Sequence, residues 1–408
     1  MKAGFGALLF LVYSFAISMG TPAPLLALQA LGLVIAGTTV TVQAFRQRSM
    51  IFPTPFLLLL LASIAFVCLS MMLSLGRGQT PAPVMVRFLQ VYISTFTIPL
   101  LSYCFVSLGE VSNEQVLRHL VNAVMAYTYI KLLIVAVVAV LNIPQIVIVK
   151  FFELIFNADP AFGIFFLNIA RFFGPTDFLS VFALYFFLFL GKGRLRIIWI
   201  LALCASIFVS YSRFVWLEGI FVIALYGVRL SRGQIFALLT SLILVAPVAT
   251  FVPTTLIEER FASANAQKSD DIRTHQVDAL TQDVDQNFLL GHGFASFSYK
   301  MVRDKQAPYS YEEQWLSIIY QFGIVGLLMI LVLLVSVLTP LLENITLDGV
   351  ALALLFGFSL LSGFANPSLI GRAAGMGFAM VYFCATNIRD RARERLWSNP
   401  TKTLFRSL

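Results

Sequence analysis

Long runs of apolar residues, separated by short polar segments, follow one another along most of the chain. A transmembrane helix needs about 20 predominantly apolar residues, and most of these runs are close to that length. We therefore predict an all-α, polytopic membrane protein with about twelve transmembrane helices. The predicted spans are 4–20, 24–44, 53–75, 84–108, 119–142, 174–191, 196–210, 214–230, 234–252, 315–338, 348–364 and 371–387.

These spans divide the chain into four predicted parts. Residues 1–252 hold about nine spans, 253–314 form one long outer loop, 315–388 hold three more spans, and 389–408 form a basic tail. The first apolar run follows Lys2 and resembles a signal peptide. It is longer than a usual signal core and further spans follow at once, so we expect an uncleaved first span.

The two longest outer segments contain further predicted helices. In the long loop, Asp270-Asp271-Ile272-Arg273 is typical of a helix start, with Val277 and Leu280 as its buried stripe. Gly291-His292-Gly293 then predicts a turn. In the shorter outer segment, 145–156 has the helical spacing of an interfacial helix. A long loop in a compact protein is usually functional, so we expect the site there.

Composition and charge support the membrane class and orient it. Apolar residues make up 59% of the chain and charged residues 12%, against about 25% charged in soluble domains. The net charge of +8 does not indicate nucleic-acid binding, because most basic residues flank predicted spans. With the N-terminus inside, the inner segments carry fifteen Lys and Arg and the short outer loops six. This bias predicts an inner-membrane protein with both termini in the cytoplasm and the long loop on the outer side.

Arginines on the outer side are the first candidate chemistry. Arg213 opens a predicted span, Arg171 and Arg372 lie at other outer helix ends, and Arg260 and Arg273 lie in the long loop. A guanidinium binds phosphate or carboxylate through two parallel hydrogen bonds. Several such groups near the bilayer surface would suit a lipid-linked diphosphate. The alternative is snorkelling to lipid headgroups, or local ion pairs such as Glu218 with Arg213 and Asp177 with Arg171.

Acidic residues form the second candidate group. Glu312 and Glu313 lie where the long loop meets the span from Trp315. A partly desolvated carboxylate there suits a general base, although negative charge also favours a helix start without any chemistry. Lys131 lies inside an apolar span, where a charge indicates function unless it snorkels or pairs with a carboxylate. The chain has neither a phosphate-binding Gly-rich loop nor a metal-ligand pattern, so we expect no metal, no cofactor and an already activated substrate.

Three stretches, taken in order, resemble the O-antigen polymerase and ligase superfamily of Wzy/WaaL-like membrane glycosyltransferases. They cover roughly residues 165–385, and each is short, so their order is the specific signal. The stretches are Ser212-Arg213 at the start of a span, Arg273 with Ala279-Leu280 and Leu290-Gly291-His292-Gly293-Phe294, and Glu312-Glu313-Gln314-Trp315-Leu316 with Gln321-Phe322-Gly323-Ile324-Val325-Gly326.

The resemblance implies a GT-C-like, metal-independent, inverting glycosyl transfer at the periplasmic face. The donor would be a glycan on undecaprenyl diphosphate, the acceptor a lipid-linked repeat unit, and a chain-length regulator protein a further partner in the bilayer. Arg213 and Arg273 match the family's diphosphate-binding arginines, and Glu312 matches the position that activates the acceptor hydroxyl. From location alone we add four substrate-binding candidates, which are Arg171, Arg260, Glu313 and Arg372.

Three functions remain open on the sequence. Ligases of the superfamily carry His where this chain has Glu312, and this difference favours a repeat-unit polymerase. The second reading is a ligase that transfers the finished glycan to lipid A core or to protein. The third is a transporter without chemistry, whose polar groups would gather near the bilayer midplane rather than in one outer loop.

Overall fold

A computed structural model of the chain is almost entirely helical, which confirms the predicted all-α class for the residues it describes. One short antiparallel pairing joins β1 (Gly163–Ile164) to β2 (Ala170–Arg171), with Gly163 opposite Arg171. The described residues are 2–17, 23–47, 54–77, 80–144, 147, 150, 163–164, 170–171, 173–229, 264–284, 287–302, 307–364 and 369–398.

Six helices in the described part of the chain are long and apolar enough to cross a membrane. The apolar stretches Ala3–Ile17, Asp177–Leu190 and Arg196–Ser210 are helical but shorter. The predicted span 234–252 and most of the interfacial helix at 145–156 lie outside the described residues, so the count of twelve stays a prediction. The six are Leu25–Arg46, Pro55–Gly76, Ala82–Ser107, Asn113–Leu141, Gln314–Ser336 and Leu347–Phe364.

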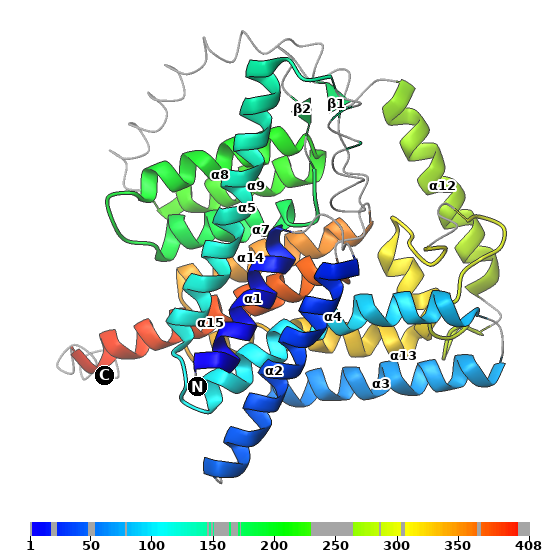
Figure 1. Cartoon of the computed structure of the whole chain (residues 1–408), viewed down its shortest axis with the longest axis horizontal. Helices are drawn as coiled ribbons and strands as arrows, with labels where there is room; N and C mark the ends of the chain where they lie inside the picture. The colour runs from blue at the N-terminus through cyan, green and yellow to red at the C-terminus, as the bar shows by residue number, and fades with distance from the viewer. Residues whose placement is uncertain are drawn as a thin grey trace, which may run out of the picture. The chain divides into compact units, whose positions relative to one another are not determined.

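The chain forms two compact units, and the first comprises Met1–Ala16, Pro24–Ala123 and Ala279–Leu408. In unit 1, α3 packs between α4 and α13, and α15 packs on α4 and α14 (Figure 1). Residues 374–388 of α15 are all buried, so α15 forms the centre of this unit. Its helices are α1 (Lys2–Ile17), α2 (Ala23–Gln47), α3 (Pro55–Arg77), α4 (Ala82–Ser107), α13 (Gln314–Ser336), η4 (Thr339–Glu343), α14 (Leu347–Leu360), η5 (Leu361–Phe364) and α15 (Arg372–Ser398).

The second unit comprises Ile17–Ala23 and Val124–Asp278. Its core is a set of three short helices, in which α7 (Asp177–Tyr185) packs on both α8 (Arg196–Ser210) and α9 (Arg213–Arg229). A five-residue π-helical turn, η2 (Phe186–Leu190), extends α7. Two long helices contribute to both units, α5 (Asn113–Leu141) and α12 (Ala264–Val284).

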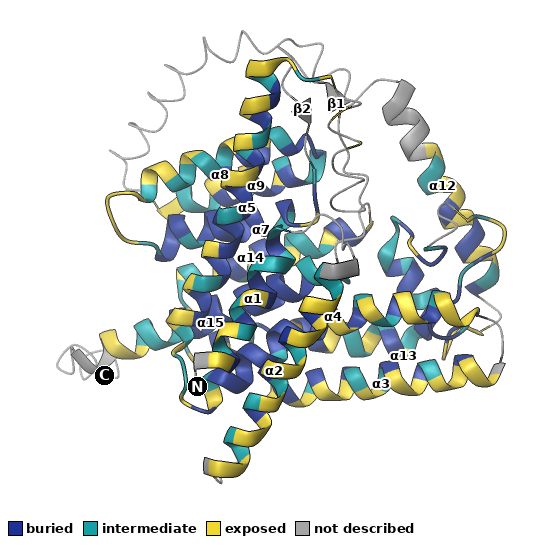
Figure 2. Cartoon of the chain, in the orientation of Figure 1, coloured by how far each residue is buried: buried dark blue, intermediate teal, exposed yellow. Residues whose placement is uncertain are grey.

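Burial follows the expectation for helices that meet lipid. Along α3, one face is exposed although its side chains are large and apolar, among them Leu58, Leu69 and Met72 (Figure 2). Apolar side chains on an outer surface are costly in water and favoured in hydrocarbon. By contrast, α7 is almost wholly buried. The exposed apolar faces agree with a multi-pass membrane protein.

Candidate functional site

In unit 1 the glycine-rich loop 287–293 docks on a break in α13. Gly323 interrupts that helix with φ 66° and ψ −171°, so two carbonyls and two amides around it lose their ordinary i to i−4 partners. The loop supplies a partner to all four. The bonds run from His292 N to Tyr320 O (2.8 Å), Gly293 N to Gln321 O (2.9 Å), Ile324 N to Phe288 O (2.9 Å) and Val325 N to Leu289 O (3.4 Å).

Glycine is required on both sides of this contact. Gly291 has φ 70°, and a Cβ there would lie 2.4 Å from the Gln321 oxygen. A Cβ on Gly323 would lie 2.2 Å from the Leu289 oxygen. The predicted turn at Gly291-His292-Gly293 is therefore confirmed, and its structural role is to hold the loop on α13. His292 completes the contact, because its ring stacks on Tyr320 with centroids 4.3 Å apart.

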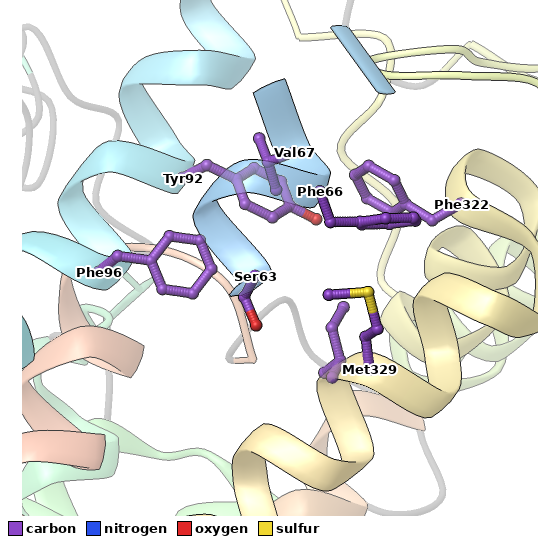
Figure 3. Close-up of a pocket in the computed structure, with 8 residues that line it drawn as sticks. Ser63, Phe66, Val67, Tyr92, Phe96, Phe322 and Met329 are labelled. Carbon is purple, nitrogen blue, oxygen red and sulfur yellow. The ribbon is translucent and has the colours of Figure 1, made fainter. Parts of the chain in front are cut away.

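A small apolar pocket lies behind this break, between α3, α4 and α13 (Figure 3). Two hydroxyls interrupt its apolar wall, those of Ser63 and Tyr92. The Ser63 hydroxyl donates to Leu59 O, and among the described residues the buried Tyr92 hydroxyl has no hydrogen-bond partner. The lining offers no carboxylate or cation to a polar substrate. Its residues are Ser63, Phe66, Val67, Tyr92, Phe96, Phe322, Met329 and Ile330.

The end of α12 is joined through a polar network to residues that follow the loop 287–293. Asp283 accepts hydrogen bonds from Ser298 Oγ (2.9 Å) and Lys300 Nζ (2.7 Å), and the Tyr311 hydroxyl accepts one from Ser298 N (2.8 Å). The hydrogen bond from Lys300 is the main cause that holds the pKa of Asp283 below its ordinary value. Burial raises the pKa of Tyr311 to about 12. Leu280 and Val284 pack with Tyr311 and Tyr320 beneath this network.

The long-loop helix differs from its prediction in two ways. It begins at Ala264 rather than at Asp270, and Val277 is 37% exposed while Leu280 is fully buried. The buried side chains are Gln276, Ala279, Leu280 and Val284. The prediction for Val277 was wrong because the stripe follows the face that packs on Tyr311 and Tyr320, and position 277 lies off that face.

The two candidate carboxylates of unit 1 lie directly before the first residue of α13. Glu313 is the N-cap residue of α13, and both Glu312 and Glu313 are partly buried. The next residue, Gln314, accepts a hydrogen bond from Leu369 N at 2.5 Å. Trp315 donates to Leu360 O at 2.9 Å. These bonds attach the start of α13 to the segment that leads into α15.

Arg372 is the first residue of that helix. The amide of Gly371, directly before it, donates to Thr95 Oγ1 of α4 at 2.7 Å. The guanidinium of Arg372 lies over the Phe15 ring, 5.5 Å from its centroid. Unit 1 therefore holds Glu312, Glu313 and Arg372.

Unit 2 holds the other candidate arginines. Arg171 lies in β2, Arg213 opens α9, and Arg273 lies on α12 and is partly buried. Arg260 lies outside the described residues. The joint action of the arginines and carboxylates thus stays a prediction.

A tight corner between α8 and α9 presents Arg213. Tyr211 ends α8 in the left-handed conformation (φ 52°), and the indole N–H of Trp216 donates to Ile207 O (3.0 Å) and Phe208 O (3.1 Å). These carbonyls belong to the last turn of α8, where Ile207 O also accepts from Ser210 Oγ (2.6 Å) and Phe208 O also accepts from Tyr211 N (3.1 Å). Ser212 N donates to Ser210 Oγ at 3.4 Å. The corner Ser210–Arg213 is therefore closed by local hydrogen bonds.

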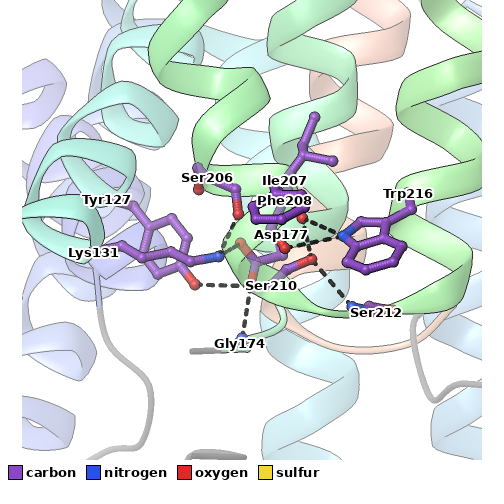
Figure 4. Close-up of polar contacts among 10 residues, drawn as sticks. All are labelled: Tyr127, Lys131, Gly174, Asp177, Ser206, Ile207, Phe208, Ser210, Ser212 and Trp216. Atoms are coloured by element: carbon purple, nitrogen blue, oxygen red, sulfur yellow. Dashed lines mark hydrogen bonds and ion pairs between the residues drawn. The ribbon is translucent and has the colours of Figure 1, made fainter. Parts of the chain in front are cut away.

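Close to this corner lies a buried ion pair between Lys131 and Asp177 (Figure 4). Lys131 Nζ donates to Asp177 Oδ1 (2.6 Å) and to Ser206 O (2.8 Å). Asp177 Oδ2 also accepts from the Tyr127 hydroxyl (3.2 Å) and from Gly174 N (2.9 Å). Both charged side chains are 0% exposed. Of the alternatives for Lys131, pairing with a carboxylate is confirmed.

Sequence reasoning named Asp177 as a partner for Arg171 and not for Lys131, and it missed Tyr127, Trp216 and Thr95 as parts of the site's support. A signal existed for Asp177, because a carboxylate at the start of an apolar helix needs a cation and Lys131 is the charge inside a neighbouring span. No local signal marks Thr95, whose partner Gly371 lies far along the chain.

The profile of the O-antigen ligase family matches residues 176–331. The matched stretch begins next to Asp177 and includes Arg213, Arg273, Glu312 and the loop that docks on α13. A search of curated proteins found no match. Residues 176–331 are therefore similar to the O-antigen ligase family, and this match supports the resemblance to the O-antigen ligase/polymerase superfamily.

Proposed function

We propose that this membrane protein is a repeat-unit polymerase for O-antigen or a related polysaccharide. The family match over 176–331 carries the proposal. It is supported by Glu312, which stands where the ligases of the superfamily carry His. The donor is a glycan on undecaprenyl diphosphate, the acceptor is a lipid-linked repeat unit, and the reaction takes place at the periplasmic face of the inner membrane.

In the proposed reaction, an acceptor hydroxyl attacks the anomeric carbon of the donor glycan from the face opposite the diphosphate. The new glycosidic bond forms as the bond to the diphosphate oxygen breaks, so the anomeric configuration inverts. Glu312 accepts the hydroxyl proton, and undecaprenyl diphosphate leaves with the electron pair. Arg213 and Arg273 stabilise the negative charge that grows on the leaving group, and no metal takes part.

The remaining candidates have supporting roles in the proposal. Arg372, whose guanidinium lies over the Phe15 ring, binds a phosphate or a sugar hydroxyl. Glu313 lies beside Glu312 at the head of α13 and binds acceptor hydroxyls. Arg171 and Arg260 contribute positive charge toward the diphosphate.

The test is extension of a defined undecaprenyl-diphosphate repeat by the purified protein, without nucleotide or added metal, with products resolved as a ladder on a gel. We expect Arg213→Ala, Arg273→Ala and Glu312→Gln each to abolish the ladder with normal expression. Arg118→Ala and Glu114→Gln are matched controls, because that pair is exposed (65% and 49%) and such pairs contribute little. Normal ladders from all three site variants would refute the site.

A ligase is the second candidate, since the matching family is described as O-antigen ligase. The two functions share a donor and differ in acceptor. A strain without the protein accumulates single-repeat glycolipid if the protein is a polymerase. The same strain accumulates long lipid-linked chains if it is a ligase. Extension by the purified protein would exclude a transporter without chemistry.

A further inference from the structure

We propose that the buried Lys131–Asp177 pair is a positioning element that fixes the corner carrying Arg213. This inference rests on the proposed function, because it assigns the pair a role in placing the arginine that binds the donor diphosphate. Neither Lys131 nor Asp177 is proposed to touch the substrate. Both are fully enclosed by unit 2, so any effect on the reaction must pass through their neighbours.

The pair ties three helices together at one point (Figure 4). Lys131 belongs to α5, Asp177 is the first residue of α7, and the Ser206 carbonyl that also accepts from Lys131 belongs to α8. Hydrogen bonds to charged groups are short and directional. Rotation or sliding of α8 would therefore break the bond from Lys131 to Ser206.

Ser206 lies one helical turn before Ser210, where the corner begins. Arg213 lies three residues after Ser210, and hydrogen bonds fix the backbone between them. Ser210 Oγ accepts from Ser212 N, and Trp216 of α9 donates to the last carbonyls of α8. A shift of α8 at Ser206 is therefore carried to Arg213, the first residue of α9.

Stability alone does not explain why such a pair is present. Removing two charges from a polar environment carries a large desolvation penalty, and replacing a buried pair by uncharged residues of similar size is often neutral or stabilising. Asp177 accepts three hydrogen bonds and Lys131 donates two, so the network gains a defined geometry instead. A defined geometry matters most where one cation must meet a diphosphate.

The experiment removes both charges together with Lys131→Met/Asp177→Asn, so that neither charge is left buried alone. Its matched control is Glu114→Gln/Arg118→Met, which removes an exposed pair from the same helix α5 with the same N–O distance of 2.6 Å. The melting temperature in detergent is measured, together with kcat and KM for the lipid-linked donor.

We expect the double variant to insert and melt close to wild type while kcat falls about tenfold to a hundredfold, because misplacement of a charge by about 1 Å has effects of that size. We expect KM to change by less than about threefold, since the lost interaction strengthens mainly in the transition state. The control pair leaves kcat and KM unchanged. A folded double variant with wild-type kcat would overturn the proposal.

A second comparison tests whether the effect passes through Arg213. In an Arg213→Lys background, where the two-pronged guanidinium is already lost, the double substitution should lower kcat by less than about threefold. An equal, additive loss in both backgrounds would overturn the proposal. If Arg213→Lys and Arg213→Ala had wild-type activity, the proposed function of Arg213 would fail instead, and the two failures are thereby distinguished.

Tyr127→Phe covers the case in which the double variant does not fold. It removes one hydroxyl from Asp177 and keeps the ion pair, so folding should be retained. We expect a loss in kcat of about two- to fivefold in a folded protein, because the carboxylate of Asp177 keeps its other two hydrogen bonds. An unchanged kcat in Tyr127→Phe, together with a double variant that is unfolded or fully active, would refute the positioning role.

Discussion

Replacement of Gly323 by alanine tests how the break in α13 is held. Gly323 has φ 66° and ψ −171°, a backbone region that essentially only glycine occupies. The added Cβ would also lie 2.2 Å from the Leu289 oxygen and 2.6 Å from the Leu290 nitrogen. These are backbone atoms and cannot rotate away from the added Cβ. Either α13 must straighten at position 323, or the loop 287–293 must move off α13.

Both outcomes destabilise unit 1 by an amount that can be estimated. The backbone strain alone is about 1–3 kcal/mol. Movement of the loop breaks the bonds from His292, Gly293 and Ile324, which are 2.8, 2.9 and 2.9 Å long, at about 0.5–1.5 kcal/mol each. The sum is about 2.5–7.5 kcal/mol, which is comparable with the whole stability of many domains.

The measurement is thermal unfolding of the purified protein in detergent, followed by intrinsic fluorescence. Gly357→Ala in α14 is the control, because its Cβ would meet no atom within 4 Å and alanine is favoured over glycine in a helix by about 0.5–1 kcal/mol. We expect Gly323→Ala to unfold well below wild type and Gly357→Ala to unfold at or slightly above it. Equal melting of Gly323→Ala and wild type would refute the account of the break.

Three further predictions concern the support of the site. The lowered pKa of Asp283 means that its carboxylate stabilises the fold above its unfolded pKa of about 3.9. This stability is lost as the pH falls through the lowered folded pKa, so the melting temperatures of wild type and Asp283→Asn should differ at pH 7 and converge near pH 3. A difference in melting temperature that does not depend on pH would contradict this. Thr95→Val removes the acceptor of Gly371 N with little change of shape, so it should reduce ladder formation. Thr95→Ser keeps the hydroxyl and should retain ladder formation. Equal activity of the two variants would show that the hydroxyl does not position Arg372. Trp216→Phe keeps an aromatic ring against Phe208 but loses two hydrogen bonds to α8. We therefore expect kcat to fall while the melting temperature changes little. Wild-type kinetics would show that the corner Ser210–Arg213 keeps its geometry without the indole.

The candidate site could be predicted from the sequence where chemistry depends on residues that are neighbours in the chain. Ser212-Arg213, Gly291-His292-Gly293 and the stretch from Gly323 to Gly326 are each short, but their order along the chain is specific and made them recognisable. Val277 was placed wrongly because the packing partners of α12, Tyr311 and Tyr320, lie in distant segments. A periodic pattern indicates that a helix has a buried face, but the partner decides which face is buried.

By itself the sequence determined the membrane class, the all-α fold and the likeness of residues 176–331 to the O-antigen ligase family, because apolar runs and short ordered motifs are local properties of the chain. The tertiary structure decided which residues from distant parts of the chain contact one another. Lys131 pairs with a carboxylate 46 residues away, and the loop 287–293 completes a break in α13 that lies some 30 residues further along. Such contacts depend on which helices pack together, and the free energy of that packing is summed over the whole fold rather than encoded in any one segment.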